Sequence, residues 1–128
     1  MHKGYLQLAA FLGALSVALG AFAAHGLKKV ASEYAVGIFE TGVRYQFYHV
    51  FALALTAILW KDFPVKTLNM AGIFFILGII CFSGSLYLLT WMNIKDISAT
   101  KFVGPITPLG GLFFIVGWVL LLVSIKKS

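Results

Sequence analysis

The sequence is poor in charge: Asp, Glu, Lys and Arg make up only 11% of its 128 residues, against about 25% in a typical soluble domain. It has one cysteine and three prolines, which excludes a disulfide-stabilised scaffold and a proline-rich or collagen-like chain. Polar low-complexity sequence is almost absent, which excludes a disordered chain. So few charges cannot cover a surface that faces water.

The sequence is instead rich in apolar residues, with 61% hydrophobic and 16% aromatic residues and a mean hydropathy of +0.97. This composition is typical of an integral membrane protein, here a single transmembrane domain over residues 1–128. The formal net charge is +6, but the basic residues lie where the apolar runs end and form no single basic face. We therefore expect no nucleic-acid partner.

Four runs without charge cover residues 4–24, 45–60, 67–94 and 102–125. About 20 apolar residues are needed to cross the roughly 30 Å of hydrocarbon in a bilayer. The second run is too short, so its helix must begin earlier in the chain. We predict an all-α bundle of four transmembrane helices, with spans at about 5–24, 40–60, 67–93 and 106–125.

The stretch before the second span has the features of a helix start. Ser32 is suited to cap it, and Glu33 complements the positive N-terminal end of a helix. Gly37 and Gly42 could allow a bend. A separate short interfacial helix that turns into the second span is therefore an open alternative to one continuous helix.

The first apolar run has two interpretations. Lys3 and the A-x-A pattern of residues 21–23 are also typical of a cleaved signal peptide. We favour an uncleaved span, because the run is longer than the usual apolar segment of such a peptide. Its stripes of Ala, Gly and Ser would let helices approach closely, so we predict a homo-oligomer.

Four crossings bring several polar residues to the same membrane face, whichever way the bundle is oriented. They lie at the end of the first span and at the starts of the second and fourth, where Thr107 is expected to cap its helix. A basic cluster beside a helix N-terminus favours an anion such as a lipid phosphate. The predicted ligand or anion site consists of His25, Lys28, Lys29, Arg44 and Thr107.

Glu40 and Arg44 stand four residues apart with the acid first, the favoured order for an ion pair on a helix. We predict a structural pair that fixes the second span against its neighbours. The functional alternative is that Arg44 binds an anion.

A second set of polar residues lies deeper in the spans. His49 shares a helical stripe with Tyr45, and it is either hydrogen-bonded between helices or part of a proton relay. The hydroxyls of Ser83 and Ser85 serve either helix contact or a pore lining. The candidate polar path consists of Glu40, Tyr45, His49, Ser83 and Ser85.

Chemistry of other kinds finds no support in the sequence. No nucleophile-elbow, zinc-protease, phosphate-loop or dinucleotide-binding motif occurs, so we expect no enzyme and no cofactor. His25, His49 and Glu40 follow no ligand spacing and Cys81 is a lone thiol, so we expect no metal site.

Four blocks of the sequence together resemble a known family. They are GAFAAHGL at 20–27, FETGVRYQFYH at 39–49, FSGSLYLL at 82–89 and ITPLGGLFFIVGW at 106–118. The chain resembles the small bacterial inner-membrane proteins typified by YgdD, whose vertebrate relative is transmembrane protein 256 and which form a domain family of unknown function. The resemblance implies a four-span membrane protein and no activity. The matching residues are Gly20, His25, Gly26, Phe39, Glu40, Arg44, Tyr45, Gln46, His49, Gly84, Ser85, Tyr87, Thr107, Pro108, Gly110 and Gly111.

Two functional hypotheses follow. The leading one is a non-enzymatic component that binds membrane lipids or a partner membrane protein through the polar cluster in one leaflet. The competing one is a small transporter or channel for an ion or small solute that passes Glu40, His49 and Ser85. We expect the protein in the bacterial cytoplasmic membrane, and the distribution of Lys and Arg favours both termini in the cytoplasm.

Overall fold

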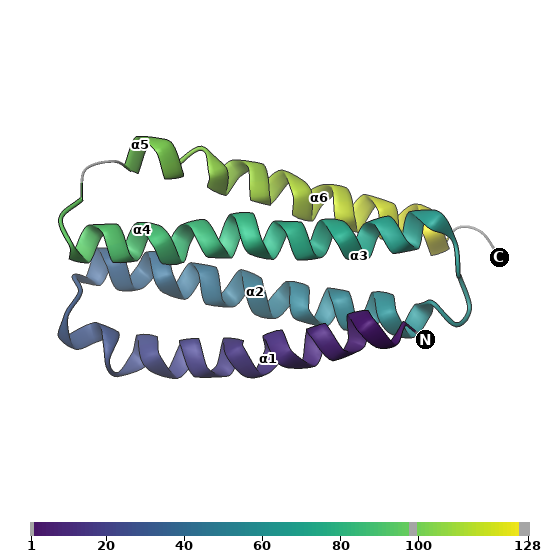
Figure 1. Ribbon diagram of the computed structural model, residues 1–128, viewed down its shortest axis with the longest axis horizontal. Helices are drawn as coiled ribbons and strands as arrows, with labels where there is room; N and C mark the ends of the chain where they lie inside the picture. The colour runs from purple at the N-terminus through teal and green to yellow at the C-terminus, as the bar shows by residue number, and fades with distance from the viewer. Residues whose placement is uncertain (1, 98–99, 126–128) are drawn as a thin grey trace.

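The computed structural model describes residues 2–97 and 100–125, with the side chains of residues 100 and 101 left out. It consists of long helices that lie side by side as four rods (Figure 1). The described residues contain no strand, which confirms the all-α prediction. The elements are α1 (Lys3–Ala24), the 3-10 turn η1 (Leu27–Lys29), α2 (Glu33–Leu59), α3 (Lys66–Gly78), the π-helical turn η2 (Ile79–Ser83), α4 (Gly84–Ile94), α5 (Thr100–Val103) and α6 (Ile106–Ile125).

Helix α2 begins as the sequence predicts. The Ser32 hydroxyl accepts a hydrogen bond from the Ala35 amide at 3.2 Å, which satisfies one of the free N–H groups of the first turn. From there α2 continues without a break through Gly37 and Gly42. Gly42 is buried against Tyr87 of α4, so it serves close packing and not a bend. The alternative of a separate interfacial helix is therefore wrong.

The third rod is made of α3, η2 and α4 in direct succession. A π-helical turn inserts an extra residue into a helix and so rotates the faces that follow it. Before the turn, α3 packs mainly against α6; after it, α4 packs mainly against α2. The turn η2 itself contacts both α2 and α6. This rotation lets a single rod serve two different neighbours.

Packing follows the chain order across the molecule. Helix α1 packs against α2, α2 against the third rod, and α6 against α3 and η2 (Figure 1). Three apolar clusters form the core, one near the turn between α1 and α2, one between α2, α3 and α6, and one between α1 and α2. Their buried members are Ala23, Leu27, Val36, Phe39 and Val43; Ala52, Leu68, Ala71, Phe75 and Leu121; and Ala9, Val50 and Leu53.

Gly110 marks the closest approach of α6 to the third rod. A Cβ atom at this position would collide with the backbone nitrogen and Cα of Phe82, in η2. No side-chain rotation can relieve a contact with backbone, so only glycine fits. This contact fixes α6 at the level of the π-helical turn.

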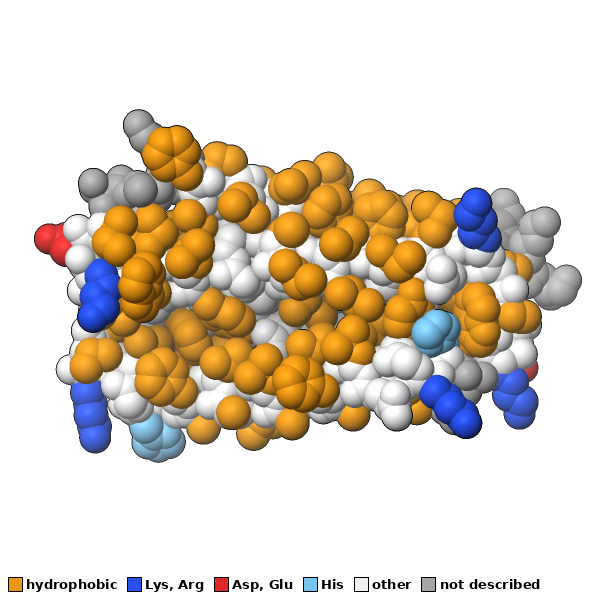
Figure 2. All heavy atoms as spheres, viewed as in Figure 1, with side chains coloured by type: hydrophobic (Ala, Val, Ile, Leu, Met, Phe, Trp, Pro, Cys, Tyr) orange, Lys and Arg blue, Asp and Glu red, His pale blue; other side chains and the backbone are white. Residues whose placement is uncertain are grey.

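Large hydrophobic side chains cover the outer surface. Figure 2 shows a broad hydrophobic band across the middle of the molecule, with Lys and Arg side chains at its two ends. Among the described residues, three helical segments are long and apolar enough to cross a membrane: Lys3–Lys29, Lys66–Ile94 and Ile106–Ile125. These correspond to three of the four predicted spans. Helix α2 is long enough, but it falls outside this set and has many polar residues in its N-terminal half.

The start of α6 differs from the prediction. Thr107 is the second residue of the helix and not its cap, and Pro108 is the third. The Thr107 hydroxyl is hydrogen-bonded to the Ser85 hydroxyl of α4. A hydroxyl used between helices is not free to cap, and the Pro105 that precedes α6 already lacks an N–H group.

Candidate functional site

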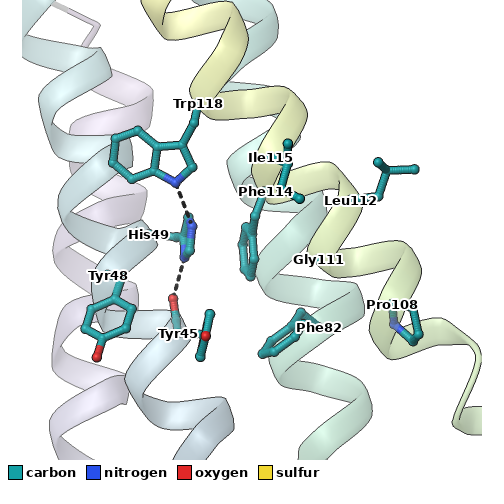
Figure 3. A pocket seen from close by; sticks show the side chains of 10 residues that line it. All are labelled: Tyr45, Tyr48, His49, Phe82, Pro108, Gly111, Leu112, Phe114, Ile115 and Trp118. Carbon is teal, nitrogen blue, oxygen red and sulfur yellow. Dashed lines mark hydrogen bonds between the residues drawn. The ribbon is translucent and has the colours of Figure 1, made fainter.

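An open groove of about 800 Å³ lies between α2 and α6, beside η2. Its walls are almost entirely aromatic and aliphatic (Figure 3). The lining residues are Tyr45, Tyr48, His49, Phe82, Pro108, Gly111, Leu112, Phe114, Ile115 and Trp118.

His49 is the most polar group of this groove, and both of its ring nitrogens have partners. Nδ1 lies 2.7 Å from the Tyr45 carbonyl oxygen, which can only accept, so Nδ1 carries the proton. Nε2 accepts a hydrogen bond from the indole N–H of Trp118 at 3.1 Å (Figure 3). The arrangement assigns a neutral imidazole with its proton on Nδ1. Protonation of Nε2 would set two N–H donors against each other.

Stacked rings hold His49 in place. The Phe114 ring lies parallel to the imidazole, with centroids 3.5 Å apart and planes 8° apart. Tyr45 packs against Phe82 with ring centroids 4.7 Å apart, which joins α2 to η2. Aromatic stacking of this kind adds to the area that the rings bury. The groove is therefore built on a rigid layer of rings.

The chemistry of the groove favours an apolar guest. The two nitrogens of His49 are already bonded, so they offer nothing to a polar ligand unless Trp118 moves. The groove is open along one side, and an elongated apolar chain could lie in it. Two residues of the predicted polar path, Tyr45 and His49, therefore line a wall of this open groove.

On its other side, α2 takes part in a closed polar network. The Gln46 amide nitrogen donates to the Ser16 hydroxyl at 2.7 Å and to the Leu12 carbonyl at 3.2 Å, both on α1. The Gln46 amide oxygen accepts from the Tyr87 hydroxyl of α4 at 2.7 Å. Gln46 is 2% exposed, and no buried side-chain nitrogen or oxygen in the described part of the chain lacks a partner. The network joins three helices and leaves no free polar atom.

The two serines of the third rod make contacts between helices. Ser83 donates to the Gly42 carbonyl of α2 at 2.7 Å, and Ser85 pairs with Thr107 of α6. Consecutive small residues thus face two neighbours. Glu40, His49 and Ser85 line three different pockets, so the described structure does not join them into one path.

The members of the predicted anion site have different surroundings. Lys28 lines a separate pocket of about 480 Å³ together with two acids, Glu33 and Glu40. His25 is exposed and bonds to the Ala21 carbonyl of its own helix at 3.0 Å. Lys29 is exposed at the end of η1, and Thr107 is paired with Ser85. Opposite charges beside Lys28 reduce its attraction for an anion.

Glu40 and Arg44 form no ion pair among the described residues. The Arg44 guanidinium instead donates to the Thr41 hydroxyl at 3.0 Å, and Arg44 is exposed. The geometry shows both side chains on α2, one turn apart and without a direct bond.

No group of three metal-ligating side chains occurs in the part of the chain that the structure describes. Cys81 is a free, half-buried thiol beside a shallow pocket.

Sequence reasoning missed two residues that organise this region, Gln46 and Trp118. In the sequence, Gln46 stood out only as a residue that matches the family, and Trp118 only as part of the block at 106–118. A glutamine and a tryptophan in the middle of apolar runs each need a hydrogen-bond partner, and this was the available signal. Which partner each finds depends on helix packing.

Comparison with known proteins identifies the family. A family model described as "Protein of unknown function (DUF423)" matches residues 19–111. A UPF0382 membrane protein of Haemophilus influenzae is 40% identical over 131 residues, which cover 100% of this chain and 98% of the relative. This chain belongs to the UPF0382 family of membrane proteins.

Other UPF0382 members are similar over nearly the same length. The membrane protein YwdK of Bacillus subtilis is 37% identical over 127 residues, with 98% of each chain covered. The inner membrane protein YgdD of Escherichia coli is 36% identical over 119 residues, which cover 93% of this chain and 86% of the relative. These matches confirm the resemblance found in the sequence, and none points to an enzymatic family. No solved structure matches the chain.

Proposed function

We propose that this UPF0382 protein is a non-enzymatic, four-span protein of the bacterial cytoplasmic membrane that binds a membrane lipid. The lipid places an acyl chain in the groove between α2 and α6. The single observation that carries this proposal is the open groove of about 800 Å³, whose walls are almost entirely aromatic and aliphatic and whose His49 ring nitrogens are already bonded within the protein.

The proposal includes α2 as the fourth span. Its 27 residues correspond to about 40 Å of helix, longer than the roughly 30 Å of hydrocarbon. It packs between α1 and the third rod, and both of these neighbours are long and apolar enough to span. A helix enclosed in this way crosses with its neighbours, and its buried polar groups face protein. Both termini then lie on one side, and the distribution of Lys and Arg favours the cytoplasm for that side.

The dimensions of the groove suit an acyl chain. On α6 its lining runs from Pro108 to Trp118, which corresponds to about 15 Å of helix. This length equals about one leaflet of the hydrocarbon. Its lining begins at Pro108, near the start of α6, and the groove is open along one side, so a lipid tail can enter it sideways from the bilayer.

Transport past Glu40, His49 and Ser85 has less support. These residues line three separate pockets, and the hydroxyl of Ser85 and the ring of His49 are both engaged between helices.

Filling the groove tests the proposal. The Cβ of Gly111 would lie 3.8 Å from the Phe82 ring, an ordinary contact, so Gly111→Leu should fold and occupy the groove. Native mass spectrometry of wild type purified from membranes should show a retained phospholipid that survives detergent exchange. In Gly111→Leu its occupancy should fall by about ten-fold, which corresponds to 1.4 kcal/mol of binding free energy.

Gly84→Leu is the matched control, because a Cβ at Gly84 meets nothing within 4 Å and lies outside the groove. It should retain the lipid at the wild-type level. Equal retention by wild type and Gly111→Leu, or no retained lipid in any of the three proteins, would contradict the proposal.

A further inference from the structure

Helix α2 has an exposed ridge with the spacing of a coiled-coil seam. The residues alternate at intervals of four and three, which is a repeat of 3.5 residues. Tyr48 and Phe51 on this ridge are 53% and 67% exposed, and a Cβ at Gly37 would meet nothing within 4 Å. The ridge consists of Gly37, Thr41, Arg44, Tyr48, Phe51, Leu55 and Ile58.

Charge on this ridge lies at an unfavourable depth. Arg44 is about 16 Å along α2 from Glu33, and α2 extends about 5 Å beyond the hydrocarbon at each end if it is centred. Arg44 is therefore about 11 Å below the boundary on the proposed four-span topology, and it is exposed without an ion pair among the described residues. Glu40, one turn earlier and half-buried, lines a pocket with Lys28 but forms no ion pair within the described residues. Charges at this depth are normally paired and covered by protein.

We propose that a second copy of this chain docks against the ridge, α2 beside α2, and that Glu40 of each copy pairs with Arg44 of the other. The proposal rests on the four-span topology and not on lipid binding in the groove. Copies inserted with the same orientation run parallel, and a two-fold axis between them brings the same patch of each copy into contact. Residues spaced by 3.5 form the seam of a left-handed pair.

Charge complementarity selects a second copy over another protein or lipid. Arg44 lies in the seam and Glu40 flanks it one turn earlier, so two-fold symmetry can place the acid of each copy beside the base of the other and leave no net charge at this level. Gly37 and Thr41 are small and four apart, the spacing that lets two helix backbones approach closely in a membrane. The close approach lies beside the charges, where a short distance between copies strengthens the pairs.

Charge exchange tests the pairing. The dimer fraction would be measured in lipid vesicles by energy transfer between full-length chains labelled at the C-terminus, over a series of protein-to-lipid ratios. Arg44→Glu should lower the dimer affinity on the order of ten-fold or more, because four acids then face one another. The double variant Glu40→Arg with Arg44→Glu should restore most of it. Lys29→Glu, outside the ridge, is the control and should leave the affinity unchanged.

Cross-linking tests the surface itself without altering the charges. In a Cys81→Ser background, Phe51→Cys should give a disulfide-linked dimer under mild oxidation in membranes. Leu122→Cys, similarly exposed on α6 at 69%, should give no disulfide-linked dimer. A monomer at all protein-to-lipid ratios, equal cross-linking at both positions, or a dimer that Arg44→Glu leaves unchanged would overturn the proposal. Unchanged lipid retention in Gly111→Leu would contradict lipid binding in the groove but not this dimer, so the two proposals fail independently.

Discussion

The two sides of α2 use polar side chains in opposite ways. Toward α1 and α4, Gln46 binds Ser16 and Tyr87 in a network without space around it. Toward α6, His49 is equally well bonded, to the Tyr45 carbonyl and the Trp118 indole, but the aromatic rings around it leave a groove beside them. Satisfied hydrogen bonds alone therefore do not close an interface. On the closed side they are surrounded by packed side chains, and on the open side α6 stands off from α2.

We expect the largest effect on stability from a change that displaces α6, because the groove exists only while η2 holds α6 at its present distance. Gly110→Ala would drive its Cβ into the Phe82 backbone and should lower the free energy of unfolding by about 3 kcal/mol. Thermal unfolding in detergent would measure it. The adjacent Gly111→Ala meets only the Phe82 ring, at 3.8 Å, and should be neutral or slightly stabilising. Equal stability of the two variants would show that α6 is free to move.

A smaller loss of stability is expected on the side of α2 that faces α1 and α4, when the side-chain amide of Gln46 is removed. Gln46→Leu has a similar volume but leaves the half-buried Tyr87 hydroxyl without its Gln46 acceptor, and we expect a loss of about 2 kcal/mol. Tyr87→Phe alone should cost about 1 kcal/mol. The double variant should cost less than the sum, since both changes remove the same bond. Additive losses would show that this network does not act as a unit.

We expect the smallest loss of stability on the side of α2 that faces α6, when the hydrogen bond from Trp118 to His49 is removed. Trp118→Phe keeps an aromatic ring but leaves His49 Nε2 without a donor, for an expected loss of about 1 kcal/mol. Trp91→Phe, an exposed indole with no such bond, should show none. Nitrogen NMR of the imidazole should report the neutral Nδ1–H form in wild type. A proton on Nε2 would contradict the assigned geometry.

Much of the fold was predictable because apolar runs and helix-capping residues act locally. Ser32 caps α2 as predicted, and the three apolar segments lie where the charge pattern placed them. The interfacial alternative failed because Gly42 looks like a hinge in sequence but is used for contact with Tyr87. Thr107 failed as a cap because its hydroxyl has a better partner in Ser85, which is 22 residues away.

The candidate site was harder to predict, because it depends on which faces the helices turn toward one another. Topology placed the basic residues at one end of the bundle, but it could not show that Lys28 would lie beside two acids. The extra residue in η2 rotates α4 relative to α3, and a helical wheel drawn through residues 67–93 misses this rotation. The groove could not be predicted from the sequence for the same reason.

The sequence by itself determined that the chain is helical and belongs in a bilayer, because the shortage of charge and the length of the apolar runs require it whatever the packing. Only the tertiary structure decided which polar atoms are used up between helices and where a guest could lie. Those outcomes depend on contacts between residues far apart in the chain, such as Gly110 with Phe82 and His49 with Trp118. Local helix propensity does not determine the distance between two rods, whereas the side chains packed between them do.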